Sequence, residues 1–170
     1  LFRSPVFDMD PAEASHDIVR EINLARSNPT EYARFLADMD FDPADLMETV
    51  AFLDTVVPKT PLRPNPGLMQ MASAYATDIA ASEGLDHPLT LRFRADQHMQ
   101  DENVLLLREL VNAGAQSPRD AVAQFIVNAN DPAKSYRKAL FGDEFGSIGA
   151  ALGPHQGYGI VCVVEVAEIR

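Results

Sequence analysis

The chain has 170 residues, of which 46% are hydrophobic and 23% are charged. This length and composition fit one folded domain and exclude intrinsic disorder, which requires low hydrophobicity with high charge. The formal net charge is −11, from 14 Lys and Arg against 25 Asp and Glu. Nucleic acids and anionic membrane surfaces are not expected as partners, because phosphate binding needs Lys or Arg gathered on one face and no basic cluster occurs.

Cysteine content and hydropathy narrow the class of protein further. Cys162 is the only cysteine, so no intrachain disulfide can form, and its apolar surroundings predict a buried, inert thiol rather than a nucleophile. The longest apolar run, residues 160–164, is far shorter than the roughly 20 residues of a membrane helix, so no transmembrane segment is expected. The chain starts at Leu1 rather than Met, which suggests a processed or truncated N-terminus.

Capping signals predict three helices before residue 58. Residues 1–14 lack a clear period and are expected to form an arm, so the single domain is predicted to span residues 15–170. Ser15 is a suitable N-cap for a first helix that runs to about Ser27. Asn-Pro at 28–29 and Asp-Pro at 42–43 repeat one start signal, a capping side chain followed by Pro at the first helical position.

A proline-rich connection leads to the most regular helix of the chain. Four prolines in residues 58–66 indicate an extended connection, with Leu62 as its predicted anchor in the core. The helix that starts at Pro66 has a stripe of apolar residues at i, i+3, i+4, i+7, i+8 and i+11, namely Leu68, Met71, Ala72, Tyr75, Ala76 and Ile79. This spacing predicts a buried face, and Gly84 is the predicted stop.

The second half of the chain changes from helices to strands. Residues 84–103 are polar, residues 104–107 predict a short strand, and Ser117-Pro118 opens a further helix that is expected to end at Asp131-Pro132. A short helix or turn at 136–140 precedes two β-branched runs, 146–152 and 159–167, which are joined by a Gly-Pro turn and predict a hairpin. The second run is apolar on both faces, so helices should cover the sheet from both sides. The predicted class is α+β, as a three-layer α-β-α sandwich.

The order of these segments resembles the CAP superfamily (cysteine-rich secretory proteins, antigen 5 and plant pathogenesis-related 1), and most of all its compact, cysteine-poor bacterial SCP-like branch. The resemblance covers about residues 16–167 and rests on EINLARSNP, PLRPNPGLMQMASAYATDIA, LDH, DENV, AVAQFIVN, SYRKALF, FGSIGAAL and GIVCVVEVA. In the family, LDH has Ser-His as its counterpart, DENV has Glu-Asn-Ile, and SYRKALF has Gly-His-Arg-x-x-Leu. The resemblance implies the CAP-like sandwich with a small, mainly antiparallel central sheet.

The resemblance also implies a cleft in which two histidines and two acids hold a divalent metal, commonly zinc. His87 fits the first family histidine and Glu102 the first glutamate, whereas the second histidine falls on Tyr136 and the second acid near Asn128. Zinc normally takes three or four N, S or O ligands, and a phenol is a poor substitute for imidazole at neutral pH. We therefore expect His87 and Glu102 alone to hold zinc weakly.

Other roles for the polar residues stay open at this point. A rebuilt site could include His98, Asp101 or His155, although their spacing matches no metal motif. Conversely, His87 could simply bond a free carbonyl at a helix exit, and Glu102 could cap the entry to its strand. Solvent exposure is the expectation for His98, for His155 and for His16.

Three functions are compatible with the sequence. The first is a noncatalytic, extracytoplasmic CAP-domain protein that binds a small molecule, a lipid or a protein partner in a cleft formed by His87, Glu102, Tyr136 and Asn128. The second is a hydrolase in which Glu102 is the general base and His87 the acid or a ligand, although no Ser or Cys lies in an activating motif. The third is a CAP scaffold that serves only as an interaction surface. The resemblance implies a secreted or periplasmic protein whose signal peptide has been removed, and we expect a monomer.

Overall fold

The structure is a computed structural model that describes residues 9–170. The first three helices start on Asx-Pro signals: α1 (Pro11–Ser27), α2 (Pro29–Ala37) and α3 (Pro43–Thr55). The starts of α2 and α3 confirm the prediction, but the predicted start of the first helix at Ser15 is wrong. Asp10 caps α1 by accepting a 2.7 Å hydrogen bond from the amide of Ala12, so residues 11–14 of the predicted arm are helical. The first eight residues of that arm lie outside the described residues.

The proline-rich connection reaches the core at Leu62, as predicted. Asn23 on α1 accepts a hydrogen bond from the amide of Leu62 and donates one to its carbonyl, and the Leu62 side chain is buried. The two-residue strand β1 (Arg63–Pro64) follows and leads into α4 (Pro66–Ile79). All six residues of the predicted apolar stripe of α4 are buried, which confirms it, but the helix ends at Ile79 and not at Gly84.

The middle of the chain departs most from the prediction. The polar segment contains an additional helix, α5 (Leu91–His98), and the strand β2 (Val104–Ala113) is ten residues long rather than four. After β2 come α6 (Pro118–Val127) and α7 (Ser135–Leu140). Helix α6 ends at Val127 and is capped by Asn128, which has φ 47°, so the predicted end at Asp131-Pro132 is four residues too late.

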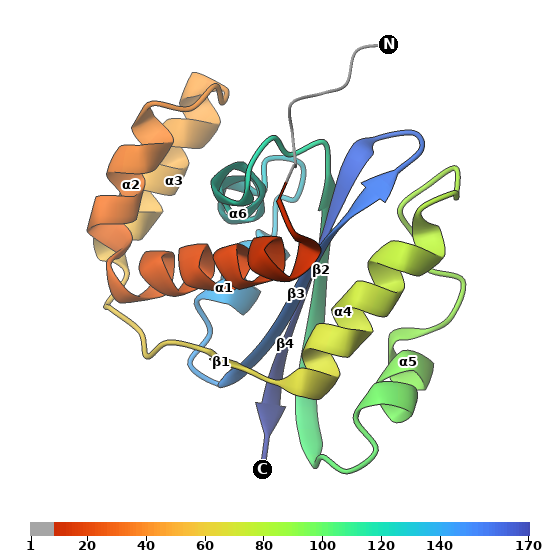
Figure 1. Ribbon diagram of the computed structural model, residues 1–170. Coiled ribbons are helices and arrows are strands. Elements are labelled where there is room, and N and C mark those ends of the chain that lie inside the picture. The colour runs from red at the N-terminus through yellow and green to blue at the C-terminus, as the bar shows by residue number, and fades with distance from the viewer. Residues whose placement is uncertain (1–8) are drawn as a thin grey trace.

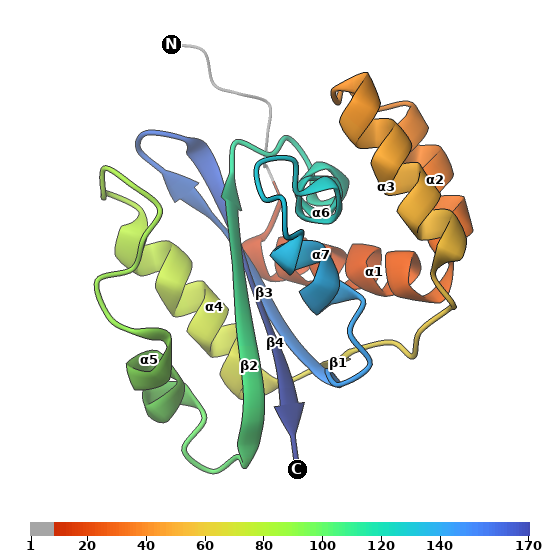
Figure 2. The ribbon, with the colours of Figure 1, turned by 180° about the vertical axis from the view of Figure 1, so that it is seen from behind.

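The C-terminal hairpin consists of β3 (Ser147–His155) and β4 (Gly159–Ile169). The sheet order is β1-β3-β4-β2, with β1 parallel to β3 and the other pairs antiparallel. One face of β4, with Cys162 and Val164, packs on the core that includes α1 and α6, and the other face, with Val161 and Val163, packs on α4. Figures 1 and 2 show the sheet between these two groups of helices. The predicted three-layer α-β-α sandwich is confirmed.

Helix α4 lies unusually close to the sheet where it crosses β3. A Cβ added to Gly149 would lie 2.1 Å from the carbonyl carbon of Leu68, so only glycine allows this approach. The close contact fixes α4, and with it the loop that follows, against β3 and β4. No helix within residues 9–170 is long and apolar enough to cross a membrane.

Candidate functional site

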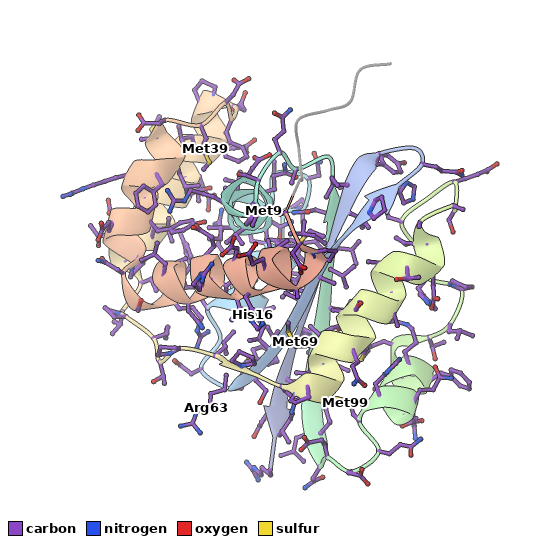
Figure 3. The ribbon with its side chains drawn as sticks, in the orientation of Figure 1. Met9, His16, Met39, Arg63, Met69 and Met99 are labelled. Atoms are coloured by element: carbon purple, nitrogen blue, oxygen red, sulfur yellow. The ribbon has the colours of Figure 1, made fainter. Side chains whose placement is uncertain are left out.

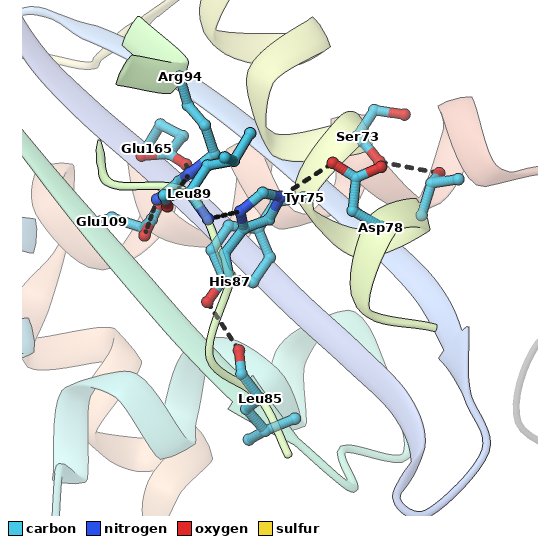
Figure 4. A network of polar contacts seen from close by, with 10 residues as sticks. Ser73, Tyr75, Asp78, Leu85, His87, Leu89, Arg94, Glu109 and Glu165 are labelled. Atoms are coloured by element: carbon cyan, nitrogen blue, oxygen red, sulfur yellow. Dashed lines mark hydrogen bonds and ion pairs between the residues drawn. The ribbon is translucent and has the colours of Figure 1, made fainter. Parts of the chain in front are cut away.

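His87 lies in the loop after α4, and its side chain is only 3% exposed. Its Nδ1 accepts a 3.0 Å hydrogen bond from the amide of Leu89, so the ring proton resides on Nε2, which lies 2.9 Å from Oδ2 of Asp78 (Figure 4). The ring also packs on Tyr75, with 5.0 Å between the two centroids. Both ring nitrogens are therefore engaged within the protein, and His87 fastens the loop to the last turn of α4.

Glu102 lies at the opposite end of α4 from His87. Its Oε1 accepts a 3.0 Å hydrogen bond from Nδ2 of Asn65, the residue that caps the start of α4, and the residue is exposed. Asn65 and Asp78 are 13 residues apart along this helix, which corresponds to about 20 Å at 1.5 Å per residue. The structure does not bring His87 and Glu102 together.

A different set of ionisable residues, which the sequence did not single out, lies beside His87. Arg94 on α5 forms a bidentate ion pair with Glu109 on β2, at 2.5 and 2.8 Å, and the Arg94 side chain is 6% exposed. Its guanidinium carbon lies 4.8 Å from the centroid of the Tyr75 ring. Burial raises the pKa of Tyr75 to about 12, and its hydroxyl donates to the carbonyl of Leu85. We call Tyr75, His87, Arg94, Glu109 and Glu165 the α4/α5 cluster.

Glu165 is the most buried member of the α4/α5 cluster. It faces Glu109 directly across the β2–β4 pair and is 0% exposed. Within residues 9–170 neither of its carboxyl oxygens has a hydrogen-bond donor, and the nearest cation, Nη1 of Arg94, is 3.9 Å away.

The two carboxyl groups of this pair have opposite pKa shifts. Burial raises the pKa of Glu165, and the neighbouring Glu109 carboxylate raises it further. Burial also opposes ionisation of Glu109, but the hydrogen bonds and charge of Arg94 outweigh it and lower the pKa of Glu109. Glu165 is thus the member of the pair that keeps its proton to higher pH, and Arg94 neutralises Glu109.

The remaining histidines and Asp101 lie apart from one another. His16 is exposed on α1 (Figure 3), His98 ends α5, and Asp101 is exposed in the following turn. His155 is buried, with Nε2 near the carbonyl of Gly84 and Nδ1 accepting from the amide of Gly157, so its predicted solvent exposure is wrong. Within residues 9–170 no group of three or more His, Cys, Asp or Glu could hold a metal ion. Zinc ligation by His87 would require one of its two hydrogen bonds to break.

Asn128 and Tyr136 do lie together, on the other side of the sheet. The left-handed conformation of Asn128 turns the chain so that its Oδ1 accepts a 3.0 Å hydrogen bond from the amide of Tyr136. The Tyr136 ring meets Phe125 edge-on at 5.6 Å. Buried Arg137 then binds the carbonyls of Ile126 and Val127 at the end of α6 and pairs with Glu48 on α3, which holds this corner in place.

The space beside these residues is a cleft of about 290 Å³, which we call the α6 cleft. Its aromatic and amide side chains are Phe41, Phe125, Tyr136, Asn112, Gln124, Asn128 and Asn130, and the rest of its lining is aliphatic. None of the lining residues carries a charge. Sequence reasoning found Asn128 and Tyr136 through the family resemblance but missed Asn112, because a lone amide within an apolar strand has no recognisable motif.

No protein-family model matches the chain, and neither does any curated protein sequence. Solved structures do match. A cysteine-rich secretory protein from Staphylococcus aureus superimposes with a TM-score of 0.56 at 11% identity over 95% of this chain. An extracellular protein containing an SCP domain from Bacillus anthracis superimposes with a TM-score of 0.50 at 13% identity, also over 95% of this chain. The chain has a CAP/SCP-like fold.

A third solved structure matches the chain over nearly its own full length. An outer surface protein of Borrelia burgdorferi superimposes with a TM-score of 0.51 at 18% identity, over 78% of this chain and 98% of that protein. The chain spans only 41% and 45% of the staphylococcal and Bacillus proteins. At such identities the likeness establishes the SCP-like fold and leaves the site to be interpreted from its own residues.

Proposed function

We propose that this SCP-like domain is an extracytoplasmic, noncatalytic binding protein, and that the α6 cleft receives an uncharged ligand: a small molecule, a lipid or a segment of a protein partner. The matched proteins are described as secretory, extracellular and outer surface proteins, which supports a location outside the cytoplasm. The proposal keeps Asn128 and Tyr136 as ligand-binding residues.

The observation that carries the proposal is the neutrality of the cleft. The chain has a net charge of −11, yet the lining of the α6 cleft contains only aromatic, amide and aliphatic side chains. A charged ligand would lose its hydration there without gaining a counter-charge, which is costly. An uncharged ligand can contact the partly exposed rings of Phe41 and Tyr136 and exchange hydrogen bonds with the amides, which is the usual chemistry of small-ligand sites.

The geometry around His87 gives no support to a hydrolase. A Glu102/His87 pair would have to act on one bond, but the two residues contact opposite ends of α4. Cys162 is fully buried in β4, and burial raises the pKa of its thiol. The α4/α5 cluster is instead a charge-balanced element that joins α4, α5 and the sheet.

Two matched sets of compounds test the proposal. N-acetylphenylalaninamide is neutral, phenylalaninamide is its cationic analogue and N-acetylphenylalanine its anionic analogue; hexanol, hexylammonium and hexanoate form the corresponding alkyl set. We expect the neutral member of at least one set to bind about tenfold more tightly than either ion in calorimetry. Tighter binding of the neutral compound than of the cation is the more decisive result, because the net charge of −11 on the protein should otherwise favour the cation.

Tyr136→Ala is the test variant and Tyr158→Ala the matched control, since Tyr158 is half exposed at the β3–β4 turn. Tyr136→Ala should weaken binding of the neutral compound about tenfold, and Tyr158→Ala should leave it unchanged. Equal binding of the cation, or insensitivity to Tyr136→Ala, would contradict the proposal. If no neutral compound bound at millimolar concentration, the interaction-surface hypothesis would replace it.

A further inference from the structure

Strand β2 forms one edge of the sheet. Within residues 9–170 the order β1-β3-β4-β2 gives it a single strand neighbour, β4, on one of its two sides. Figure 2 shows β2 on the outside of the sheet, between α5 on one side and α6 and α7 on the other. An edge strand exposes a row of backbone donors and acceptors, and natural proteins usually cover or disrupt such a row unless it has a use.

The hydrogen-bond register shows which residues form that row. Gly114 donates from its amide to the carbonyl of Ile160, and in an antiparallel pair the residues that face the partner alternate along the strand. The register is regular from Leu106 to Ala113, so the even-numbered residues face β4. The amides and carbonyls of Leu107, Glu109, Val111 and Ala113 therefore point away from the sheet; we call these four residues the β2 edge.

Little of the protein occupies the β2 edge. Within residues 9–170 no backbone group outside the strand pairs with the backbone of these four residues, and the only side-chain hydrogen bond to their backbone is from Nη1 of Arg108 to the carbonyl of Leu107. The register also shifts between Val104 and Leu106, at the start of the strand. An arginine bond and a bulge are both devices that discourage pairing, and both lie at the N-terminal end of β2. The C-terminal end, from Glu109 to Ala113, has neither.

That open end of β2 runs into the α6 cleft. Val111 and Asn112 line the cleft together with Phe125, Asn128 and Tyr136. The side chain of Val111 packs on the opposite side of the sheet, against the α4 core, so the backbone is the part of this residue that can face the cleft. One continuous surface therefore offers alternating backbone groups, amide side chains and a pocket with aromatic walls.

We propose that the ligand of this domain is an uncharged, extended peptide segment that pairs with the β2 edge and inserts one apolar or aromatic side chain into the α6 cleft. The inference rests on the proposed function and specifies its ligand. A peptide in β conformation presents donors and acceptors with the two-residue repeat of the β2 edge, which neither a lipid nor a rigid small molecule does. The backbone amides of the peptide can exchange hydrogen bonds with the amide side chains of the cleft. The volume of the cleft suits one large side chain of the peptide. A second copy of this chain is the weaker choice, because it would bring together two molecules of net charge −11.

The test uses acetylated, amidated heptapeptides of the form Thr-Val-Thr-X-Thr-Val-Thr, with X as Phe, Tyr or Leu. Each is prepared unmodified, with N-methyl groups at positions 2, 4 and 6, or with N-methyl groups at positions 3 and 5. In an added strand only one of these two sets of amides faces β2. We expect one methylated form to bind at least about tenfold more weakly than the unmodified peptide, and the other within about threefold.

Amide hydrogen exchange supplies the second readout. The bound peptide should slow exchange at Glu109, Val111 and Ala113, in the open part of the β2 edge, whereas Arg108, Leu110 and Asn112 already bond to β4 and should change little. Equal loss of affinity in both methylated forms, or binding without slower exchange at the β2 edge, would overturn the inference. If N-acetylphenylalaninamide bound in the cleft but no heptapeptide did, the peptide inference would fail and the proposed function would stand. If neither a heptapeptide nor any neutral compound of the two sets bound, both would fail, and protection of the β2 edge in a dimer of the free protein would favour the second copy.

Discussion

Arg94→Met is expected to lower the free energy of unfolding at pH 7 by about 3–5 kcal/mol, the usual result of removing one partner from a buried ion pair. Methionine keeps much of the apolar stem, but Glu109 loses both hydrogen bonds and its counter-charge, and Glu165 loses its nearest cation. Urea unfolding followed by circular dichroism measures the change.

Two variants show whether the loss comes from the uncompensated charge. Arg170→Met removes a partner of Glu168 at the exposed C-terminus and should cost less than about 1 kcal/mol, as surface pairs do. Adding Glu109→Gln to Arg94→Met should restore part of the lost stability, because the stranded carboxylate is then gone. A loss as small as that of Arg170→Met would mean that the α4/α5 cluster does not hold α5 to the sheet.

Glu165→Gln is expected to stabilise the protein at pH 8 by about 1–3 kcal/mol, the usual cost of a buried polar group without a partner, and to lose this advantage towards pH 4. The pKa of Glu165 is raised in the folded protein by burial and by Glu109, so between the unfolded and folded pKa values the folded state binds more protons. The stability of the natural protein therefore falls as the pH rises through that interval. Glutamine cannot ionise and can donate its amide to Glu109.

Stability curves from pH 4 to pH 8 measure this difference, with Glu168→Gln as the control on the same strand. The control should differ from the natural protein by only a small amount at every pH, because Glu168 is partly exposed and its pair with Arg170 lies at the surface. An advantage of Glu165→Gln that stayed constant with pH would contradict the assignment of the proton to Glu165.

The sequence predicts the helices best where local chemistry decides. Asn28 and Asp42 followed by proline locate two helix starts, and the apolar stripe of α4 identifies its buried face. The start of α1 was placed too late because Asp10-Pro11 carries the same signal within a segment that otherwise lacks periodicity. Helix α5 has no apolar stripe that the sequence could reveal, because its composition is polar and its one buried residue is Arg94, which forms a tertiary ion pair.

The site was harder to predict because the register of paired strands and the path of the loops between elements are tertiary properties. Glu102 and Glu109 are seven residues apart, and only the pairing of β2 with β4 decides which of them meets Arg94. Glu165 looks like the end of an apolar run, yet it lies fully buried within β4. The zinc prediction for His87 and Glu102 came from the family resemblance, and the structure places these two residues at opposite ends of α4.

An amide NMR titration of the 15N-labelled domain with N-acetylphenylalaninamide tests the central claim most directly, since it locates the binding surface without any substitution. Binding in the α6 cleft predicts chemical-shift changes centred on Val111, Phe125, Asn128 and Tyr136, with His87 and Glu102 unaffected. Changes centred on His87 and Asp78, with Asn128 and Tyr136 silent, would contradict the account and return the function to the α4/α5 side of the sheet.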